Sequence, residues 1–161
     1  MSNTRGYVFA VWCDDIRQEI GNKPSFMGVF TGGILLPSVP GVLSRLSVYL
    51  WLVMPIEQSI ESMDIQVVRD DGFVLAEIKH EGPTTVAGPR PDDALLQQVG
   101  LGLSMGAVEI PAGCQWFVVK VKVNGDELES PKLRVTVDPA SFATLMHRAA
   151  PLQVESPAAD L

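Results

Sequence analysis

The chain has 161 residues, of which 47% are hydrophobic and 19% are charged, and its formal net charge is −7. This length and apolar content fit one globular domain with a tail and exclude a disordered chain. The negative charge, without any cluster of Lys and Arg, argues against partners such as nucleic acid or an anionic membrane.

The first third of the chain predicts three β-strands. Residues 7–12 are rich in β-branched and aromatic side chains and predict the first strand. Residues 26–36 predict the second strand, with a bulge at its two adjacent glycines and an end at the prolines that follow. Residues 46–54 are almost all apolar and predict a third strand that is covered on both faces.

A β-hairpin is predicted around Asp71-Gly72, a dipeptide typical of type I′ turns. It joins two strand-like segments, residues 63–70 and 73–80. The turn implies a register in which Asp64 lies opposite Lys79, so that opposite charges face each other.

Two glycine-rich or proline-rich segments follow this hairpin. Residues 81–93 predict a long loop of the kind that can cover a small-molecule site, although no ligand is indicated. Residues 95–110 contain three glycines and predict one or two interrupted strands rather than a helix.

A second hairpin is predicted at Asn124-Gly125, between residues 115–123 and 126–137. Its register sets Lys122 opposite Glu127. A proline within the return strand removes a backbone donor and predicts a kink or a place at the sheet edge.

The end of the chain predicts a short helix, with Asp138 as its N-cap and Pro139 as its first residue. Phe142, Leu145 and Met146 have helical spacing. They are candidates for binding a partner's groove, or alternatively for covering the open end of their own domain. The last residues, rich in Pro, Ala and acidic side chains, are expected to be disordered.

These elements together predict an all-β fold. We expect an immunoglobulin-like β-sandwich of about seven to nine antiparallel strands over residues 1–138. Residues 139–161 are expected to form the short helix and the disordered tail.

The densest group of chemically capable side chains lies between the first two predicted strands. If this segment is extended, side chains alternate between two faces; if it is a helical turn, Asp15 caps it. The candidate functional cluster is Cys13, Asp14, Asp15, Arg17, Glu19 and Lys23.

Two interpretations of the acidic residues remain open. Asp14, Asp15 and Glu19 supply oxygen atoms of the kind that calcium and similar hard cations prefer. The simpler interpretation makes an aspartate a cap and Arg17 its ion-pair partner, and it is favoured because no calcium-loop pattern is present.

Cysteine and tryptophan residues also permit two interpretations each. Cys13 is either a buried core residue or a nucleophile with His80 or His147 as its base, and the spacing does not decide whether it pairs with Cys114. The tryptophans at positions 12, 51 and 116 either pack in the core or line a ligand groove.

The segment Cys13-Asp14-Asp15-Ile16-Arg17-Gln18-Glu19, followed by residues 22–30, resembles a family of short bacterial proteins of unknown function. The resemblance covers roughly residues 7–137 and is strongest in the first third. It implies an all-β bacterial domain and carries no activity with it.

We therefore expect a non-enzymatic module for protein–protein binding or self-association, without a cofactor. The alternative is a small metal-dependent module or hydrolase that uses Asp14, Asp15 and Glu19. With no signal peptide and no apolar run near the roughly 20 residues of a membrane helix, we expect a cytoplasmic location with reduced thiols.

Overall fold

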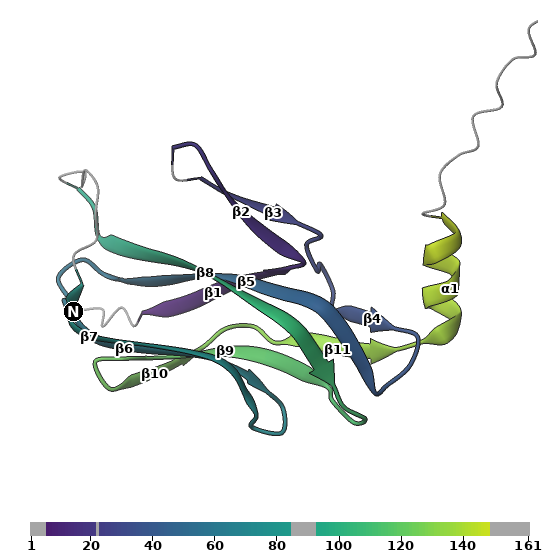
Figure 1. Ribbon diagram of the computed structural model, residues 1–161. Helices are drawn as coiled ribbons and strands as arrows, with labels where there is room; N and C mark the ends of the chain where they lie inside the picture. Colours follow the sequence, from purple (N-terminus) through teal and green to yellow (C-terminus); the bar gives the residue numbers. More distant parts are fainter. Residues whose placement is uncertain (1–5, 22, 85–92, 149–161) are drawn as a thin grey trace, which may run out of the picture.

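A computed structural model gives the fold and describes residues 6–21, 23–84 and 93–148. Within these ranges the chain forms eleven strands and one helix, so the all-β prediction is confirmed. The strands are more numerous than the seven to nine expected, and one neighbouring pair, β4 and β11, is parallel. Figure 1 shows the strands in two layers, with the helix at one end.

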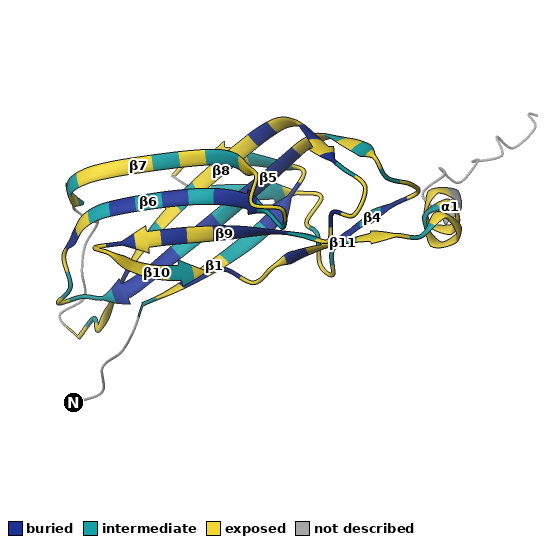
Figure 2. Cartoon of the chain, turned by 90° about the horizontal axis from the view of Figure 1, so that it is seen from below, coloured by how far each residue is buried: buried dark blue, intermediate teal, exposed yellow. Residues whose placement is uncertain are grey.

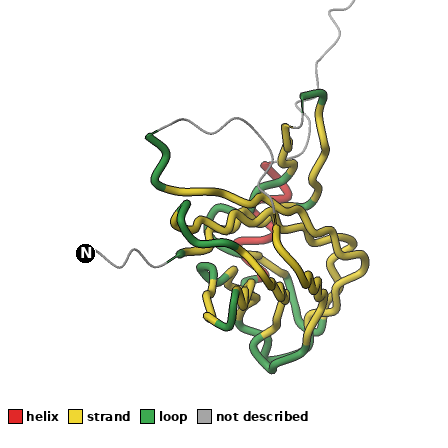
Figure 3. The backbone as a smooth tube through the Cα atoms, turned by 90° about the vertical axis from the view of Figure 1, so that its left-hand side faces the viewer, coloured by secondary structure: helices red, strands yellow, loops and turns green. Residues whose placement is uncertain are grey.

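The first layer is a three-stranded antiparallel sheet in the order β1-β5-β8. Its strands span Tyr7–Cys13 (β1), Gly41–Pro55 (β5) and Leu96–Ile110 (β8). β5 is much longer than the predicted 46–54, and β8 fills the predicted range as one strand that its three glycines do not interrupt. A two-stranded hairpin, Asp15–Glu19 (β2) with Lys23–Met27 (β3), projects beyond this layer (Figures 1 and 3).

The second layer is a six-stranded sheet in the order β4-β11-β9-β6-β7, with β10 also paired to β9. Its strands are Ile34–Leu36 (β4), Ile60–Arg69 (β6), Val74–Thr84 (β7), Trp116–Val123 (β9), Asp126–Glu129 (β10) and Leu133–Val137 (β11). The break between β10 and β11 surrounds Pro131, which confirms the predicted kink. Most of the predicted 81–93 loop lies outside the described residues, but its first residues extend β7.

The core lies between the two layers and takes alternate side chains from each strand. Leu50 and Leu52 of β5 and Phe117 and Val121 of β9 are among its fully or almost fully buried members. Figure 2 shows this alternation as dark and light bands along β6 and β9. The two sheets therefore form a sandwich with one continuous apolar interior.

Both predicted hairpin registers are confirmed. Asp64 lies opposite Lys79, and Lys122 lies opposite Glu127. At Asn124-Gly125 both residues have positive φ, 49° and 93°, as a type I′ turn requires.

The predicted type I′ turn at Asp71-Gly72 is wrong, because only Gly72 has a positive φ. The amide of Gly72 donates to the carbonyl of Arg69 at 2.9 Å, which makes a three-residue loop that ends in a glycine bulge. This loop shifts the register by one residue. A second irregularity, which leaves Leu75 without a partner on β6, shifts it back, so the ladder from Val67 to Ser62 keeps the predicted pairing before a further shift at Ile60.

The single strand predicted over residues 26–36 is also wrong. The chain leaves the hairpin at Gly28, where φ is 63°, and reaches the second layer at Gly33, where φ is 143°. Between them the amide of Phe30 donates to the carbonyl of Trp12 at 2.9 Å. The glycines therefore carry the chain from one layer to the other instead of forming a bulge.

Helix α1 spans Pro139–Arg148 and begins where predicted. The carboxylate of Asp138 accepts hydrogen bonds from the amides of Ala140 and Ser141, both at 3.1 Å. The side chain of Ser141 and then these two amides lower the pKa of Asp138. The N-cap prediction is confirmed.

Candidate functional site

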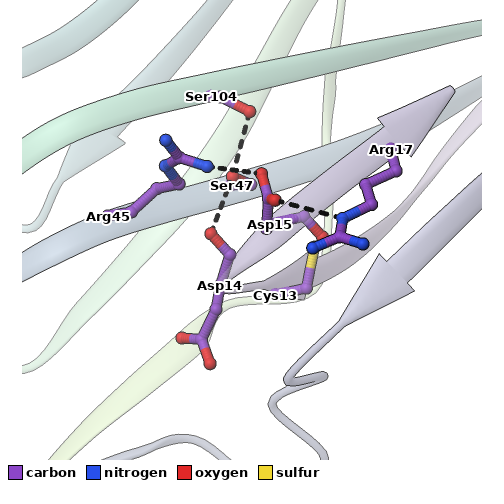
Figure 4. Close-up of polar contacts among 7 residues, drawn as sticks. All are labelled: Cys13, Asp14, Asp15, Arg17, Arg45, Ser47 and Ser104. Carbon is purple, nitrogen blue, oxygen red and sulfur yellow. Dashed lines mark hydrogen bonds and ion pairs between the residues drawn. The ribbon is translucent and has the colours of Figure 1, made fainter.

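The base of the β2–β3 hairpin is held by a buried serine. The chain bends at Asp14, whose amide donates to the carbonyl of Met27 at 2.9 Å. The hydroxyl of Ser47, on β5, donates to the carbonyl of Asp14 at 3.1 Å. Ser47 has a single proton, so the hydroxyl of Ser104, 3.0 Å away, donates to it in turn. Figure 4 shows this chain of hydrogen bonds from β8 through β5 to the hairpin.

Asp15 contributes charge to the same junction. Its carboxylate lies 2.7 Å from Nη1 of Arg45 and 3.8 Å from Nε of Arg17 (Figure 4). All three side chains are at least partly exposed, so each pair contributes only a few tenths of a kcal/mol up to about 1 kcal/mol. These contacts agree with the simpler interpretation of the sequence, in which Arg17 is the ion-pair partner of an aspartate.

The hairpin covers part of the outer face of the three-stranded sheet. Ile16 lies over Gly102, where a Cβ atom would be 3.4 Å from its Cδ1. Phe26 packs edge-on against Tyr49 and Trp51, with ring centroids 5.4 and 5.9 Å apart. These apolar contacts hold the hairpin to the sheet and cover part of the sheet's aromatic outer face.

The uncovered part of that face forms an aromatic surface, defined by Tyr7, Phe9 and Trp51. Phe9 stacks on Trp51 with centroids 5.7 Å apart. Tyr7 and Phe9 remain 54% and 50% exposed, although they belong to the first strand of the fold. Together with Val53 and Gln98 they line an open depression of about 420 Å³.

The outer face of the other sheet is a charged surface. Its side chains alternate in sign across the strands, and Lys120 lies 3.6 Å from Glu129 while Lys79 lies 3.1 Å from Glu77. The remaining polar members are Asp64, Gln66, Lys122 and Glu127. The two outer faces of the sandwich thus differ: one has the polar character expected of a solvated sheet, and the other is aromatic.

The predicted cluster is divided by the structure. The extended form is confirmed, because residues 15–19 are strand β2, and the helical turn is wrong. Glu19 and Lys23 face each other at the hairpin tip. At about 3.3 Å per residue the tip is about 13 Å along the strand from Asp15. No three His, Cys, Asp or Glu side chains in the described ranges are arranged to hold a metal ion, and Asp14, Asp15 and Glu19 do not converge.

Cys13 is fully buried, and its thiol donates to the carbonyl of Asp15 at 3.4 Å. Burial raises the pKa of this thiol, and the charges of Asp14 and Asp15 raise it further. A thiol in this environment is a poor nucleophile because the thiolate is disfavoured. Cys13 and Cys114 are both free rather than paired.

Cys114 leads to a prediction about pH. Burial, followed by the charge of Asp70, raises the pKa of its thiol from 9.0 to about 11. Above pH 9 the unfolded chain loses this proton while the folded chain keeps it, so stability falls as pH rises toward 11. Urea unfolding across that range measures the fall, and Cys114→Ala should make it shallower; an equally steep fall in the variant would contradict the assignment.

The three candidate residues of the terminal helix are not gathered over the core. Leu145 and Met146 are 54% and 61% exposed, and Phe142 is half-buried. The helix contacts β4 at the end of the sandwich (Figure 1). The arrangement leaves Leu145 and Met146 available for contact with another molecule.

The aromatic surface was not predicted from the sequence. The signal for it was that the side chains on both faces of the first strand are apolar. Almost all side chains of residues 46–54 are apolar as well. Trp12 does lie in the core and Trp51 lies at the surface, whereas Trp116 is covered by the Lys132 ammonium, 3.8 Å from the ring centroid. Trp51 and Trp116 are both half-buried, and Trp51 contributes to the aromatic surface.

A model for a family described as a family of unknown function, DUF6941, matches residues 8–136. The chain belongs to this family. The DUF6941 match covers all but the first and last residues of the described strands and leaves α1 outside. No curated protein matches the chain. Among the described residues, no helix has the length and apolar character needed to cross a membrane.

Proposed function

We propose that this protein is a non-enzymatic binding or assembly module that makes protein contacts through its aromatic surface. The observation that supports this is the contrast between its two outer faces. Exposed aromatic side chains in a contiguous group are typical of protein interfaces, where they supply much of the binding energy. Tyr7 and Phe9 are each about half exposed, so they have the most apolar area left to bury against a partner.

In this proposal the cluster at residues 13–23 is structural. Ser47, Asp15 and their partners hold the hairpin against the sheet, and the hairpin forms one wall of the aromatic surface. The apolar residue Ile20 is exposed at the tip of this hairpin. Phe142, Leu145 and Met146 of α1 provide a second, smaller contact region.

The proposal also covers the fold of the module, its cellular compartment and the kind of partner it binds. Two packed sheets support an immunoglobulin-like sandwich over residues 1–138, with residues 139–161 as an appended helix and tail. Two free cysteines support a reducing compartment, for which we propose the cytoplasm. We propose a protein partner or a second copy rather than nucleic acid or a membrane, because the net charge is −7.

Photo-crosslinking tests the contact surface. With p-benzoylphenylalanine in place of Phe9, we expect irradiation of producing cells to give a discrete adduct, identified by peptide mass and then reproduced with purified components. The matched control places the same group at Lys122, on the charged surface. Equal labelling at both positions, or none at position 9 in a folded protein, would contradict the proposal.

A further inference from the structure

The second edge of β8 is unpaired in the part of the chain that the structure describes. β8 runs for 15 residues and pairs with β5 along almost its whole length, and no described strand lies on its other side. A strand edge presents a row of free backbone N–H and C=O groups, which is a template for pairing with another strand.

The β8 edge lacks the charged side chains that would hinder pairing with another strand. No charged residue occurs from Ala94 to Val108. By contrast β7, the edge strand of the other sheet, carries Glu77, Lys79 and Glu81. Charged side chains are a common device for preventing edge-to-edge pairing. The fold therefore protects the β7 edge, whereas the 15-residue edge strand β8 carries no charge over residues 96–108, and neither does the shorter edge strand β1.

The core is also incompletely closed at β8. Val99, Leu101 and Leu103 point inward, opposite Leu52, Leu50 and Val48 of β5. The three β5 side chains are fully buried, while the three β8 side chains are only half-buried. Beside them a groove of about 470 Å³ runs between β7 and β8, lined in part by Leu75, Met105 and Val108. Another strand added to β8 would cover this apolar row.

We propose that the occupant is a second copy of this chain, paired antiparallel through β8 about a two-fold axis near Gly102. This inference names a partner for the proposed assembly role and rests on it. A strand that pairs with itself antiparallel makes the self-complementary interface that two-fold dimers use. It joins the two three-stranded sheets into one six-stranded sheet and leaves the aromatic surface of each copy uncovered.

The charge pattern favours a second copy. Pairing centred on Gly102 sets Glu109, the charged end of the strand, opposite the exposed and uncharged Leu95 of the other copy, so like charges do not meet. Residues 96–108 give a contact about 43 Å long, at about 3.3 Å per residue. Across one sheet about 10 Å thick this corresponds to roughly 400 Å² per partner, less than the roughly 800 Å² of stable interfaces, so the expected dimer is a weak one.

Sedimentation from about 1 µM to about 1 mM tests this dimer with a matched pair of variants. We expect the wild type to dimerise within this range and Val99→Lys to weaken dimerisation at least about tenfold, because it places an unpaired charge in the apolar row that the dimer would cover. Val137→Lys, on the far strand β11, should leave it unchanged. A wild type that stays monomeric, or a folded Val99→Lys variant that dimerises normally, would overturn the inference.

Hydrogen exchange of the wild type keeps the test independent of any variant. Amides of residues 96–108 should gain protection at the higher protein concentration, while those of β7 should not. Protection that develops around Phe9 and Trp51 instead would overturn the β8 dimer and leave the proposed function intact. Protection at β8 together with no specific cross-link at position 9 would support the dimer and count against the aromatic surface.

Discussion

Phe117→Ala is expected to destabilise the protein by about 3–5 kcal/mol, the usual effect of removing a buried aromatic ring. Phe117 is fully buried on β9, in the middle of the six-stranded sheet, and its neighbours across the ladders are Leu133 and Arg69. The loss comes from the apolar area returned to water and from the cavity left behind. Because domains have a free energy of unfolding of only about 5–15 kcal/mol, this single change removes a large part of it.

The matched control is Phe73→Ala, the same substitution at an exposed site. Phe73 is 57% exposed at the end of the β6–β7 hairpin, and its ring lies 4.8 Å from the Arg69 guanidinium. Losing that contact is expected to lower stability by no more than about 1 kcal/mol. Urea unfolding of both variants measures the difference, and similar values for the two would contradict the two-layer core.

Gly33→Ala is expected to lower stability by more than about 2 kcal/mol. Gly33 has a φ of 143°, a conformation that costs an L-residue about 1–3 kcal/mol. A Cβ atom there would also lie 2.7 Å from the backbone carbonyl oxygen of Arg134, which has little freedom to move. The clash would separate β4 from β11, because the next residue, Ile34, pairs with Val135.

The neighbouring glycine provides the control. A Cβ atom at Gly32 would have no atom within 4 Å, and its φ lies outside the left-handed region. Gly32→Ala should therefore be neutral, or slightly stabilising through the lower entropy of the unfolded chain. Chemical unfolding of the two variants decides the point; equal stability would mean that the close approach of Gly33 to β11 is absent.

The features that could be predicted from the sequence are local ones. Asn124-Gly125 and Asp71-Gly72 each mark a reversal, and the charges on the flanking strands agree with the register. A turn dipeptide and the side chains within a few residues of it contain all the information that such a prediction needs. The Asp138 cap was predictable for the same reason.

The features that could not be predicted depend on contacts between distant residues. Residues 26–36 are apolar and read as one strand, but the tertiary fold divides them between the hairpin and the other sheet. The glycines of β8 suggested interruption, yet Tyr49 lies over Gly100 and Gly102 and replaces the missing side chains. Neither outcome can be inferred without knowing which strand lies alongside.

The candidate site shows the same division. The density of charge at residues 13–23 was visible in the sequence, and Asp15 does form ion pairs. The aromatic surface combines Phe9 with Trp51, which lie 42 positions apart in the sequence. Only the pairing of β1 with β5 brings them together on the outer face.

The central claim is that this outer face is a contact surface, and hydroxyl-radical footprinting tests it most directly. Tyr7, Phe9 and Trp51 should be readily oxidised in dilute purified protein and clearly less oxidised within producing cells, while exposed Phe73 reacts alike in both. If the three aromatic residues are oxidised as readily in cells as in dilute solution, nothing covers the surface there and the account is contradicted.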